Sequence, residues 1–367
     1  MPATTASLSQ SGDFNQATLT QIGVAQSIGA TQIGVENQLS ATQAGVGSSL
    51  VTLQDGYLND ATTWQQGDDN SLSLTQLGAS GNSIDYYLEG DDNYGQLYQA
   101  GGNQLDASTY GDGNGLIASQ FGDDNYVDVY VSGDDNGINA TQSGVDNLAV
   151  YTVDGADGSY IYSWQSGQSN EVYIDVLARN SGAISTNNDF SVIQDGNSNV
   201  TDILLRGDGS YVSSEQYGSD NYMTVTQPAH HSNSVVSLQE GTANSLSVFM
   251  GDPINSYDSH QWGDENDASV RFTARRNSAA SEQYGELNSL SLLVSNEQNS
   301  VFMGQYGDSN VIQGIGGGEF EVGGFGGSVS LVQVGSANLI QGHQLSDASS
   351  MNVFQSGSFN SATITQQ

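Results

Sequence analysis

The sequence predicts an all-β fold, a β-solenoid of about sixteen 22-residue rungs, each a strand, a turn, a strand and a turn, with amyloid-like cross-β stacking. Three observations predict it: a glutamine and glycine signal that returns along the whole chain, alternation of apolar and polar residues after each signal, and stretches rich in glycine and aspartate between the alternating segments. One two-stranded rung cannot stabilise itself. Stacked rungs bury their inward side chains and pair their backbones.

The repeat is marked by a glutamine followed two positions later by glycine. Successive copies return at a nearly constant interval, except for two longer steps, from Gln165 to Gln194 and from Gln305 to Gln333, and in fourteen of sixteen copies an asparagine stands five positions after the glutamine. A disordered chain would not keep such spacing, so the pattern indicates a repeat fold. The glutamines are Gln10, Gln32, Gln54, Gln76, Gln99, Gln120, Gln142, Gln165, Gln194, Gln216, Gln239, Gln261, Gln283, Gln305, Gln333 and Gln355.

Each repeat divides into strands and turns. After the asparagine the residues alternate, as in Asn136, Ile138, Ala140 and Gln142, which is typical of a strand with one buried face. The Gly-x-x-Asn stretches between strands, often GDDN or GDSN, favour tight turns that need positive φ. We therefore expect one solenoid over residues 7–367 with loop insertions near 177–190 and 314–328, and we interpret residues 1–6 as the remnant of a leader or the start of an expression product.

Inward-facing amides are expected to form ladders along the stack. A buried glutamine needs partners for its two donors and its acceptor. In register, each side chain can bond the same side chain one rung away, and a slip of one residue would turn every amide outward. The amides therefore fix register as well as stability, and representative turn and ladder positions are Gly12, Asn15, Gly34, Asn37, Gly357 and Asn360.

The spacing Gln-x-Gly-x-x-Asn-x-Ala-x-x-x-Gln is complete in QSGDFNQATLTQ, residues 10–21, and in QSGSFNSATITQ, residues 355–366. It resembles the curlin repeat of the curli major subunit, and the resemblance covers nearly the whole chain. It implies a secreted bacterial protein that polymerises into functional amyloid fibres of the biofilm matrix at the cell surface. It also implies three partners: further copies of the chain, a nucleator subunit and an outer-membrane secretion channel.

The two ends of the chain are close to this consensus, whereas the second-half glutamine position drifts in the middle to Leu88, Val131, Val153 and Leu205. Monomeric solenoids protect their terminal rungs because an open strand edge recruits other chains. Consensus ends instead favour a head-to-tail homopolymer. The alternative is a monomeric acidic β-solenoid that serves as an adhesin or as a cation- or ligand-binding surface. The expected docking residues are Gln10, Asn15, Gln21, Gln355, Asn360 and Gln366.

Composition restricts the function further. Five arginines stand against 41 acidic residues, for a formal net charge of -36, so nucleic acid and anionic membrane surfaces would repel the chain. The sequence contains no run of about 18 apolar residues, the pattern that would predict a membrane-spanning helix. The carboxylates recur in turns rather than as a catalytic pair, and the adjacent His230 and His231 lack a spaced carboxylate partner, so we expect neither an enzyme nor a cofactor.

Acidic turns recur on one side of four successive rungs, as GDDN, GDDN, GDGN and GDDN. Stacking would bring neighbouring carboxylates to about 5 Å from each other along the axis. They are either ordinary solvated turn residues or, because oxygen-rich turns suit Ca²⁺, a column of calcium sites. The residues are Asp68, Asp69, Asp91, Asp92, Asp112, Asp134 and Asp135.

Overall fold

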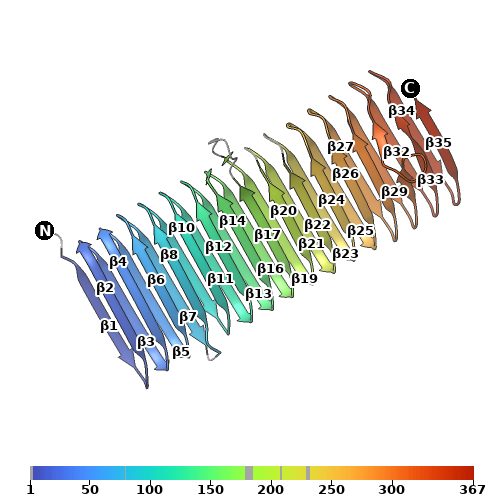
Figure 1. The fold of residues 1–367 in the computed structure, drawn as a ribbon. Coiled ribbons are helices and arrows are strands. Elements are labelled where there is room, and N and C mark those ends of the chain that lie inside the picture. Colours follow the sequence, from blue (N-terminus) through green and yellow to red (C-terminus); the bar gives the residue numbers. More distant parts are fainter. Residues whose placement is uncertain (1–2, 79, 178–184, 207–208, 229–231) are drawn as a thin grey trace. The chain divides into compact units, whose positions relative to one another are not determined.

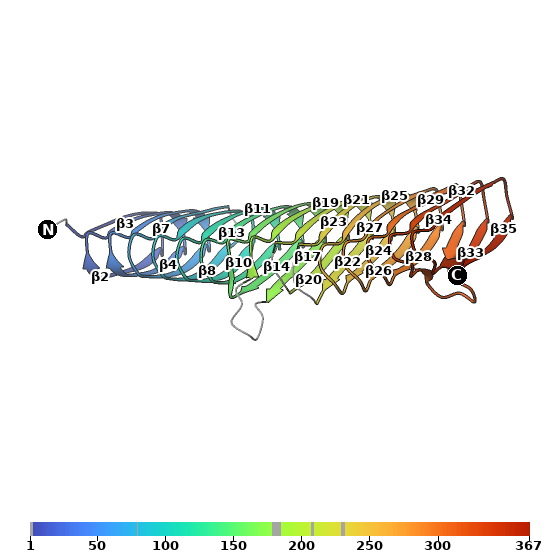
Figure 2. The ribbon, with the colours of Figure 1, turned by 90° about the horizontal axis from the view of Figure 1, so that it is seen from above.

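The computed structural model describes residues 3–78, 80–177, 185–206, 209–228 and 232–367. Those residues form only strands and turns, and the fold class predicted from the sequence is confirmed. Contacts divide the chain into two units, residues 1–187 and 188–367. In each unit the chain alternates between two stacked parallel sheets, here called sheet A and sheet B (Figure 1). Figure 2 shows, for each unit taken by itself, the two sheets facing each other with turns on both sides.

In unit 1, sheet A holds the strands that carry the Gln-x-Gly glutamines, and sheet B holds the strands that follow them. Sheet A contains β1 (Thr5–Ser11), β3 (Ser27–Val35), β5 (Ser49–Tyr57), β7 (Ser71–Gly78), β9 (Tyr94–Ala100), β11 (Gly115–Asp123), β13 (Gly137–Val145) and β16 (Tyr160–Gln168). Sheet B contains β2 (Gln16–Val24), β4 (Gln38–Val46), β6 (Asp60–Gln66), β8 (Ser83–Glu89), β10 (Gln104–Tyr110), β12 (Tyr126–Ser132), β14 (Leu148–Asp154) and β17 (Glu171–Leu177).

Unit 2 repeats this arrangement. Its sheet A contains β19 (Asp189–Asn197), β21 (Tyr211–Ser219), β23 (Ser234–Thr242), β25 (Ser256–Asp264), β27 (Ser278–Tyr284), β29 (Ser300–Tyr306), β32 (Ser328–Val334) and β34 (Ser350–Ser356). Its sheet B contains β20 (Val200–Leu205), β22 (Tyr222–Gln227), β24 (Ser245–Met250), β26 (Asp267–Phe272), β28 (Ser289–Val294), β30 (Val311–Gln313), β31 (Phe320–Val322), β33 (Leu339–Gln344) and β35 (Ser361–Gln366).

Equivalent residues of successive rungs are paired in register. Gln10 pairs with Gln32, and Gln32 pairs with Gln54, through parallel strands. Within a strand, burial alternates with a period of two, so that β13 buries Ile138, Ala140 and Gln142 and turns the residues between them outward. The core therefore lies between the two sheets of each unit, as the alternation in the sequence predicts.

The core also contains large side chains that the consensus does not show. Tyr86, Tyr151 and Phe190 are fully buried among the smaller Ala, Leu, Ile and Val residues. Space for Tyr86 comes from the opposite sheet, where a Cβ on Gly95 would lie only 2.9 Å from Tyr86 Cε1. The Tyr86 hydroxyl lies 3.3 Å from Thr109 Oγ1, so its polar atom is satisfied. Burial raises the pKa of Tyr86 to about 12, because a phenolate would lose its hydration there.

The turns depend on two positive-φ positions. The first is the glycine of Gln-x-Gly, such as Gly34 with φ of 109°, where a Cβ would lie 1.9 Å from Gly56 O of the next rung. The second is the residue immediately before the asparagine, such as Phe14 and Glu36, both with φ of 59°. Only glycine fits the first position, whereas the second accepts a side chain at a moderate conformational cost.

The two predicted insertions differ in how far the structure describes them. Of residues 177–190, the segment 178–184 lies outside the described residues, while β18 (Ser185–Thr186) pairs with β15 (Ala156–Asp157). Within 314–328, Phe320–Val322 rejoins sheet B as β31, so that β30 and β31 lie between β28 and β33. The loop that projects from the sheet is therefore confined to residues 314–319. Among the described residues, no helix is long and apolar enough to cross a bilayer.

Candidate self-assembly surface

The Gln-x-Gly glutamines form a hydrogen-bonded ladder in the core of each unit. In unit 1, Gln32 Nε2 donates to Gln54 Oε1 at 2.8 Å, and Gln142 Nε2 donates to Gln165 Oε1 at 2.9 Å. In unit 2, Gln216 Nε2 donates to Gln239 Oε1 at 2.8 Å. These side chains are fully buried, and Gln32 Nε2 also donates to the Gln16 carbonyl at 2.8 Å. Along the ladder, the amide donor points towards the next rung in chain order.

The asparagines form a second ladder with the opposite polarity. Asn37 Nδ2 donates back to Asn15 Oδ1 at 3.0 Å, and the Asn37 backbone N–H donates to the same oxygen at 3.1 Å. In unit 2, Asn338 Nδ2 donates back to Asn310 Oδ1 at 3.0 Å. Asn15 Nδ2 also donates forward to the Gly34 carbonyl at 2.9 Å, so an asparagine connects its own turn to both neighbours. Each rung thus carries two amide ladders that run in opposite directions.

A further asparagine ladder, at the second turn of the rung, was not predicted from the sequence. The Asn93 backbone N–H donates to Asn70 Oδ1 at 2.9 Å, and the Asn114 backbone N–H donates to Asn93 Oδ1 at 2.8 Å. The signal was present in the GDDN and GDGN stretches, whose last residue occupies the same place in the half-repeat as Asn15 does.

The N-terminal rung of unit 1 has unused hydrogen-bonding groups. Gln10 is exposed and donates to Gln32 Oε1 at 2.6 Å, but its own Oε1 accepts no hydrogen bond within the described residues. The Asn15 backbone N–H likewise has no acceptor there. Leu8 is 45% exposed, although its register partner Ala30 is only 3% exposed. This rung therefore presents an acceptor, a donor and uncovered core residues.

The last rung of unit 2 presents the complementary groups. Gln355 Oε1 accepts from Gln333 Nε2 at 3.1 Å, and Gln355 Nε2 uses one of its two hydrogens on the Leu339 carbonyl at 3.1 Å. Asn360 Nδ2 donates to Asn338 Oδ1 at 2.9 Å, while Asn360 Oδ1 accepts no hydrogen bond within the described residues. This rung thus offers a glutamine donor and an asparagine acceptor.

The second glutamine position of the rung is less regular. Gln21 Nε2 donates to the Thr5 carbonyl at 3.1 Å and to Gln43 Oε1 at 3.2 Å. Gln366 is in register with Gln344, but Gln344 Nε2 turns to the Ser346 carbonyl at 2.9 Å. The predicted docking residues are therefore all on the terminal rungs, but Gln366 does not continue a side-chain ladder.

The predicted aspartate column is present, in two parts. Asp68, Asp91, Asp112 and Asp134 are exposed, and each Oδ1 accepts from a backbone N–H of the preceding rung at 2.7 to 2.8 Å. Asp69, Asp92 and Asp135 occupy the positive-φ position, with φ of 54° to 57°. The first set thus stabilises its charge by hydrogen bonds to backbone amides, which the sequence did not predict.

The structure gives no geometry for a metal centre at these turns. Among the described residues, no group of three or more His, Asp or Glu side chains is arranged to hold a metal ion. Calcium binding by the aspartate column stays a prediction. His230 and His231 lie outside the described residues.

Comparison with known families supports the repeat. A family model described as the curlin associated repeat matches residues 48–78, a stretch that contains β5, β6 and β7. The chain therefore contains a segment similar to the curlin associated repeat. A search of the curated proteins finds no match. The curlin repeat suggests a curli-type structural protein, rather than an enzyme, with an extracellular location.

Proposed function

We propose that this curlin-repeat protein is a structural subunit that assembles head to tail into extracellular, curli-like functional amyloid fibres of the biofilm matrix. The observation that carries the proposal is the opposed polarity of the two amide ladders. It leaves a donor at Gln355 and an acceptor at Asn360 on the last rung, and it leaves an acceptor at Gln10 and a donor at Asn15 on the first.

A second copy stacked at the ordinary strand spacing of about 4.8 Å would continue both ladders. Gln355 Nε2 would donate to Gln10 Oε1 of the next copy, and the Asn15 backbone N–H of that copy would donate to Asn360 Oδ1. The same contact would cover Leu8, which is 45% exposed in one chain. Because both ends match only in this order, the interface is heterologous and propagates into a filament.

The family resemblance supplies the remaining partners of the proposal, a nucleator subunit that presents a first edge and an outer-membrane channel for secretion. A monomeric acidic β-solenoid acting as an adhesin has the same fold and the same open edges. The two functions differ in one respect, since only the fibre subunit elongates from its ends.

The test replaces the four end-rung amides by carboxylates: Gln10→Glu, Asn15→Asp, Gln355→Glu and Asn360→Asp. Each change places an unpaired charge at the junction, where burial is costly. We expect folded, soluble protein that neither elongates nor is incorporated into wild-type seeds, measured by thioflavin fluorescence and negative-stain imaging. Elongation of this variant at the wild-type rate would show that the chains do not dock through these edges.

A control variant adds the same charge elsewhere. Ser73→Glu, Ser247→Glu, Ser278→Glu and Ser328→Glu lie on exposed, outward-facing strand positions. This variant should elongate nearly as fast as the wild type. If it also fails to elongate, added negative charge rather than the end rungs controls assembly, and head-to-tail docking loses its support.

A further inference from the structure

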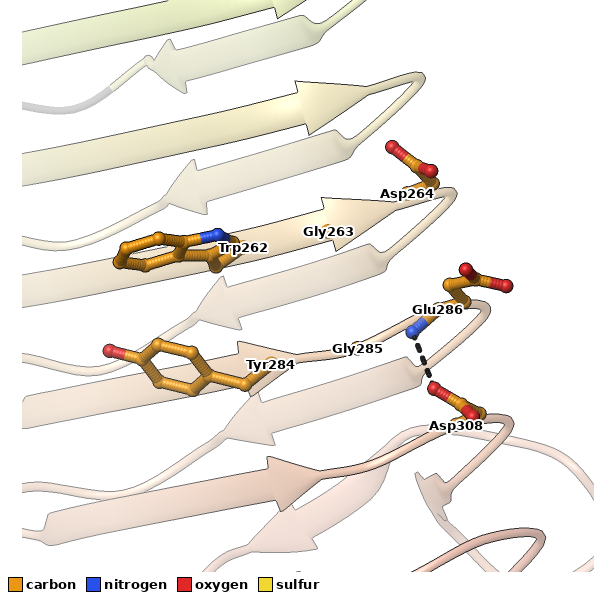
Figure 3. Close-up of a pocket in the computed structure, with 7 residues that line it drawn as sticks. All are labelled: Trp262, Gly263, Asp264, Tyr284, Gly285, Glu286 and Asp308. Carbon is orange, nitrogen blue, oxygen red and sulfur yellow. Dashed lines mark hydrogen bonds between the residues drawn. The ribbon is translucent and has the colours of Figure 1, made fainter.

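Three successive rungs of unit 2 carry the same outward triplet of an aromatic residue, a glycine and an acidic residue. The triplets are Trp262-Gly263-Asp264, Tyr284-Gly285-Glu286 and Tyr306-Gly307-Asp308, at the ends of β25, β27 and β29. The first two triplets and Asp308 line a groove of about 400 Å³. Figure 3 shows the rings on one side of the glycines and the carboxylates on the other.

One wall of the groove is aromatic and preorganised. The ring centroids of Trp262 and Tyr284 are 6.1 Å apart, and those of Tyr284 and Tyr306 are 5.5 Å apart with an interplanar angle of 11°. The Tyr306 hydroxyl donates to a carboxylate oxygen of Glu282, which fixes the last ring. Trp262 is nevertheless 55% exposed, so this wall is open to a ligand.

The opposite wall is acidic. Asp264 Oδ1 accepts from the Thr242 backbone N–H at 2.9 Å, and Asp308 Oδ1 accepts from the Glu286 backbone N–H at 3.1 Å (Figure 3). These bonds hold the two aspartates in place and leave their second oxygens, and the exposed Glu286 carboxylate, facing solvent. The wall therefore presents three negative charges at successive rungs.

The cations of neighbouring rungs do not neutralise this wall. Arg271 forms a two-point ion pair with Glu319. Arg275 and Arg276 pair with Glu297 at 2.9 and 4.0 Å, and none of these arginines lines the groove. The groove therefore keeps a net negative charge.

The floor of the groove is bare backbone for a structural reason. Gly263 and Gly285 have φ of 111° and 121°, and a Cβ on Gly263 would lie 2.1 Å from Gly285 O. Because the fold requires glycine here, a continuous trough separates the rings from the carboxylates. A narrow, extended ligand can lie in it along the stacking direction.

We propose that this groove binds a linear aliphatic polyamine whose amines are separated by three carbons. Rungs repeat at about 4.8 Å, and an extended N–C–C–C–N unit spans about 5 Å with ordinary bond lengths. Each ammonium would then face one carboxylate, while the methylene groups pack on the rings and the cations interact with the π faces. A neutral sugar would leave the carboxylates unused, and a small metal cation would leave the aromatic wall unused. The proposal does not depend on fibre assembly.

The test measures binding of bis(3-aminopropyl)amine to the full chain by equilibrium dialysis, which reports bound amine for monomer and polymer alike. Neutralising the acidic wall with Asp264→Asn, Glu286→Gln and Asp308→Asn should abolish tight binding. The new Asn side chains retain an oxygen for the backbone amides, so the fold is expected to persist. Removing the aromatic wall with Trp262→Ser and Tyr284→Ser should weaken binding roughly tenfold, the value of one or two cation–π contacts.

Matched variants in unit 1 separate the groove from bulk charge. Asp91→Asn, Asp112→Asn and Asp134→Asn remove three carboxylates that have the same bonds to backbone amides. The residues two positions before them are Glu89, Tyr110 and Ser132, so only one of the three carboxylates follows the aromatic-Gly arrangement of the groove. This variant should bind the amine as the wild type does. Equal loss in both acidic variants would overturn the proposal, because it would show that total charge alone attracts the amine.

The spacing is tested with a longer triamine of equal charge, bis(6-aminohexyl)amine. Its amines cannot all face successive rungs, so we expect at least about tenfold weaker binding, corresponding to the loss of one well-placed charge contact. Equal affinity for the two amines would overturn the match between amine spacing and rung spacing.

Discussion

Inner and terminal rungs carry the same residues in different surroundings. Gln142 is fully buried and donates to the Tyr126 carbonyl, the Asn147 carbonyl and Gln165 Oε1. Gln10 occupies the same position in the repeat but is exposed, and its side chain donates to Gln32 Oε1. The amide that is buried and fully bonded in an inner rung is thus exposed in the first rung. The difference between the two lies only in what stacks above them.

The largest loss of folding stability in an inner rung is expected for substitution of a turn glycine. A Cβ on Gly144 would lie 1.8 Å from Gly167 O, and Gly144 has φ of 127°. Gly144→Ala should therefore force neighbouring rungs apart and destabilise unit 1 by more than about 3 kcal/mol. Gly115→Ala is the control, because a Cβ on Gly115 would have no neighbour within 4 Å, and it should be nearly neutral. Hydrogen exchange in the surrounding strands measures both.

The second-largest difference in stability between inner and terminal rungs is expected when a ladder amide is removed. Gln142→Ala removes the acceptor of the buried Gln120 amide and the donor to Gln165 Oε1, and it should destabilise the surrounding rungs by about 2–4 kcal/mol. Gln10→Ala should reduce folding stability by less than about 1 kcal/mol, because its side chain is exposed. Local hydrogen exchange compares them. Equal destabilisation by the two changes would contradict the distinction between inner and terminal rungs.

Gly357 distinguishes folding from docking. A Cβ there would meet only Asn360 Nδ2 at 3.4 Å, although φ is 107°. Gly357→Ala should therefore cost the single chain only about 1 kcal/mol of backbone strain. In a filament the same Cβ would strike the carbonyl of the next copy, so the variant should fold but elongate poorly. Seeded growth assays and hydrogen exchange together provide the measurement. Normal elongation would show that the rungs at the junction are not stacked as in the interior.

The sequence predicted the ladder positions but not their direction. The regular repeat spacing and the alternation after Asn136 are enough to place Gln142 inward and in register. The direction of each amide depends on side-chain rotation, which spacing does not encode, and so the complementary ends appear only in the structure. The burial of Tyr86 depends on Gly95 in the facing sheet, a pairing across the core that a one-dimensional repeat does not reveal. The groove did have a signal, since the rings of Trp262, Tyr284 and Tyr306 follow one another at intervals of one repeat.

A smaller effect on folding stability is expected from a column of like charges. Inner rungs have this column and terminal rungs lack it. Asp85, Asp106 and Asp128 pair in register on sheet B, whereas Thr18 and Ser40 occupy this column near the N-terminal end. Burial, and then repulsion by Asp106, raise the pKa of both Asp85 and Asp128 above 3.8.

A raised carboxyl pKa means that the folded state holds more protons than the unfolded state. The folded state should therefore gain stability as the pH falls through the raised pKa values of Asp85 and Asp128. The gain is complete below the unfolded pKa of 3.8. Solvent screening limits the gain to less than about 1 kcal/mol. Asp106→Asn should flatten this part of the pH profile, measured as the denaturation midpoint between pH 7 and 4. A profile unchanged from the wild type would contradict the repulsion.

The smallest effect is expected for added calcium, measured as a change in the assembly rate. Because no three carboxylates of the described residues are grouped to hold a metal ion, calcium should change assembly rates no more than sodium chloride of matched ionic strength. Thioflavin kinetics with the wild type and with all seven column aspartates changed to asparagine measure this. An acceleration specific to calcium that disappears in the asparagine variant would establish a calcium site.

Because each rung pairs only with the rungs next to it, the fold also determines how such a chain can change in evolution. A rung contacts the rung before it and the rung after it, and nothing in its hydrogen bonds depends on how many others exist. Duplication or deletion of one whole repeat, such as 32–53, would rejoin equivalent strands and keep every inward side chain inward. Loss of a single residue within a strand would reverse the faces downstream of it. Genes of this type can therefore lengthen or shorten their product in steps of one repeat, while small frame-preserving deletions are tolerated only at the corners.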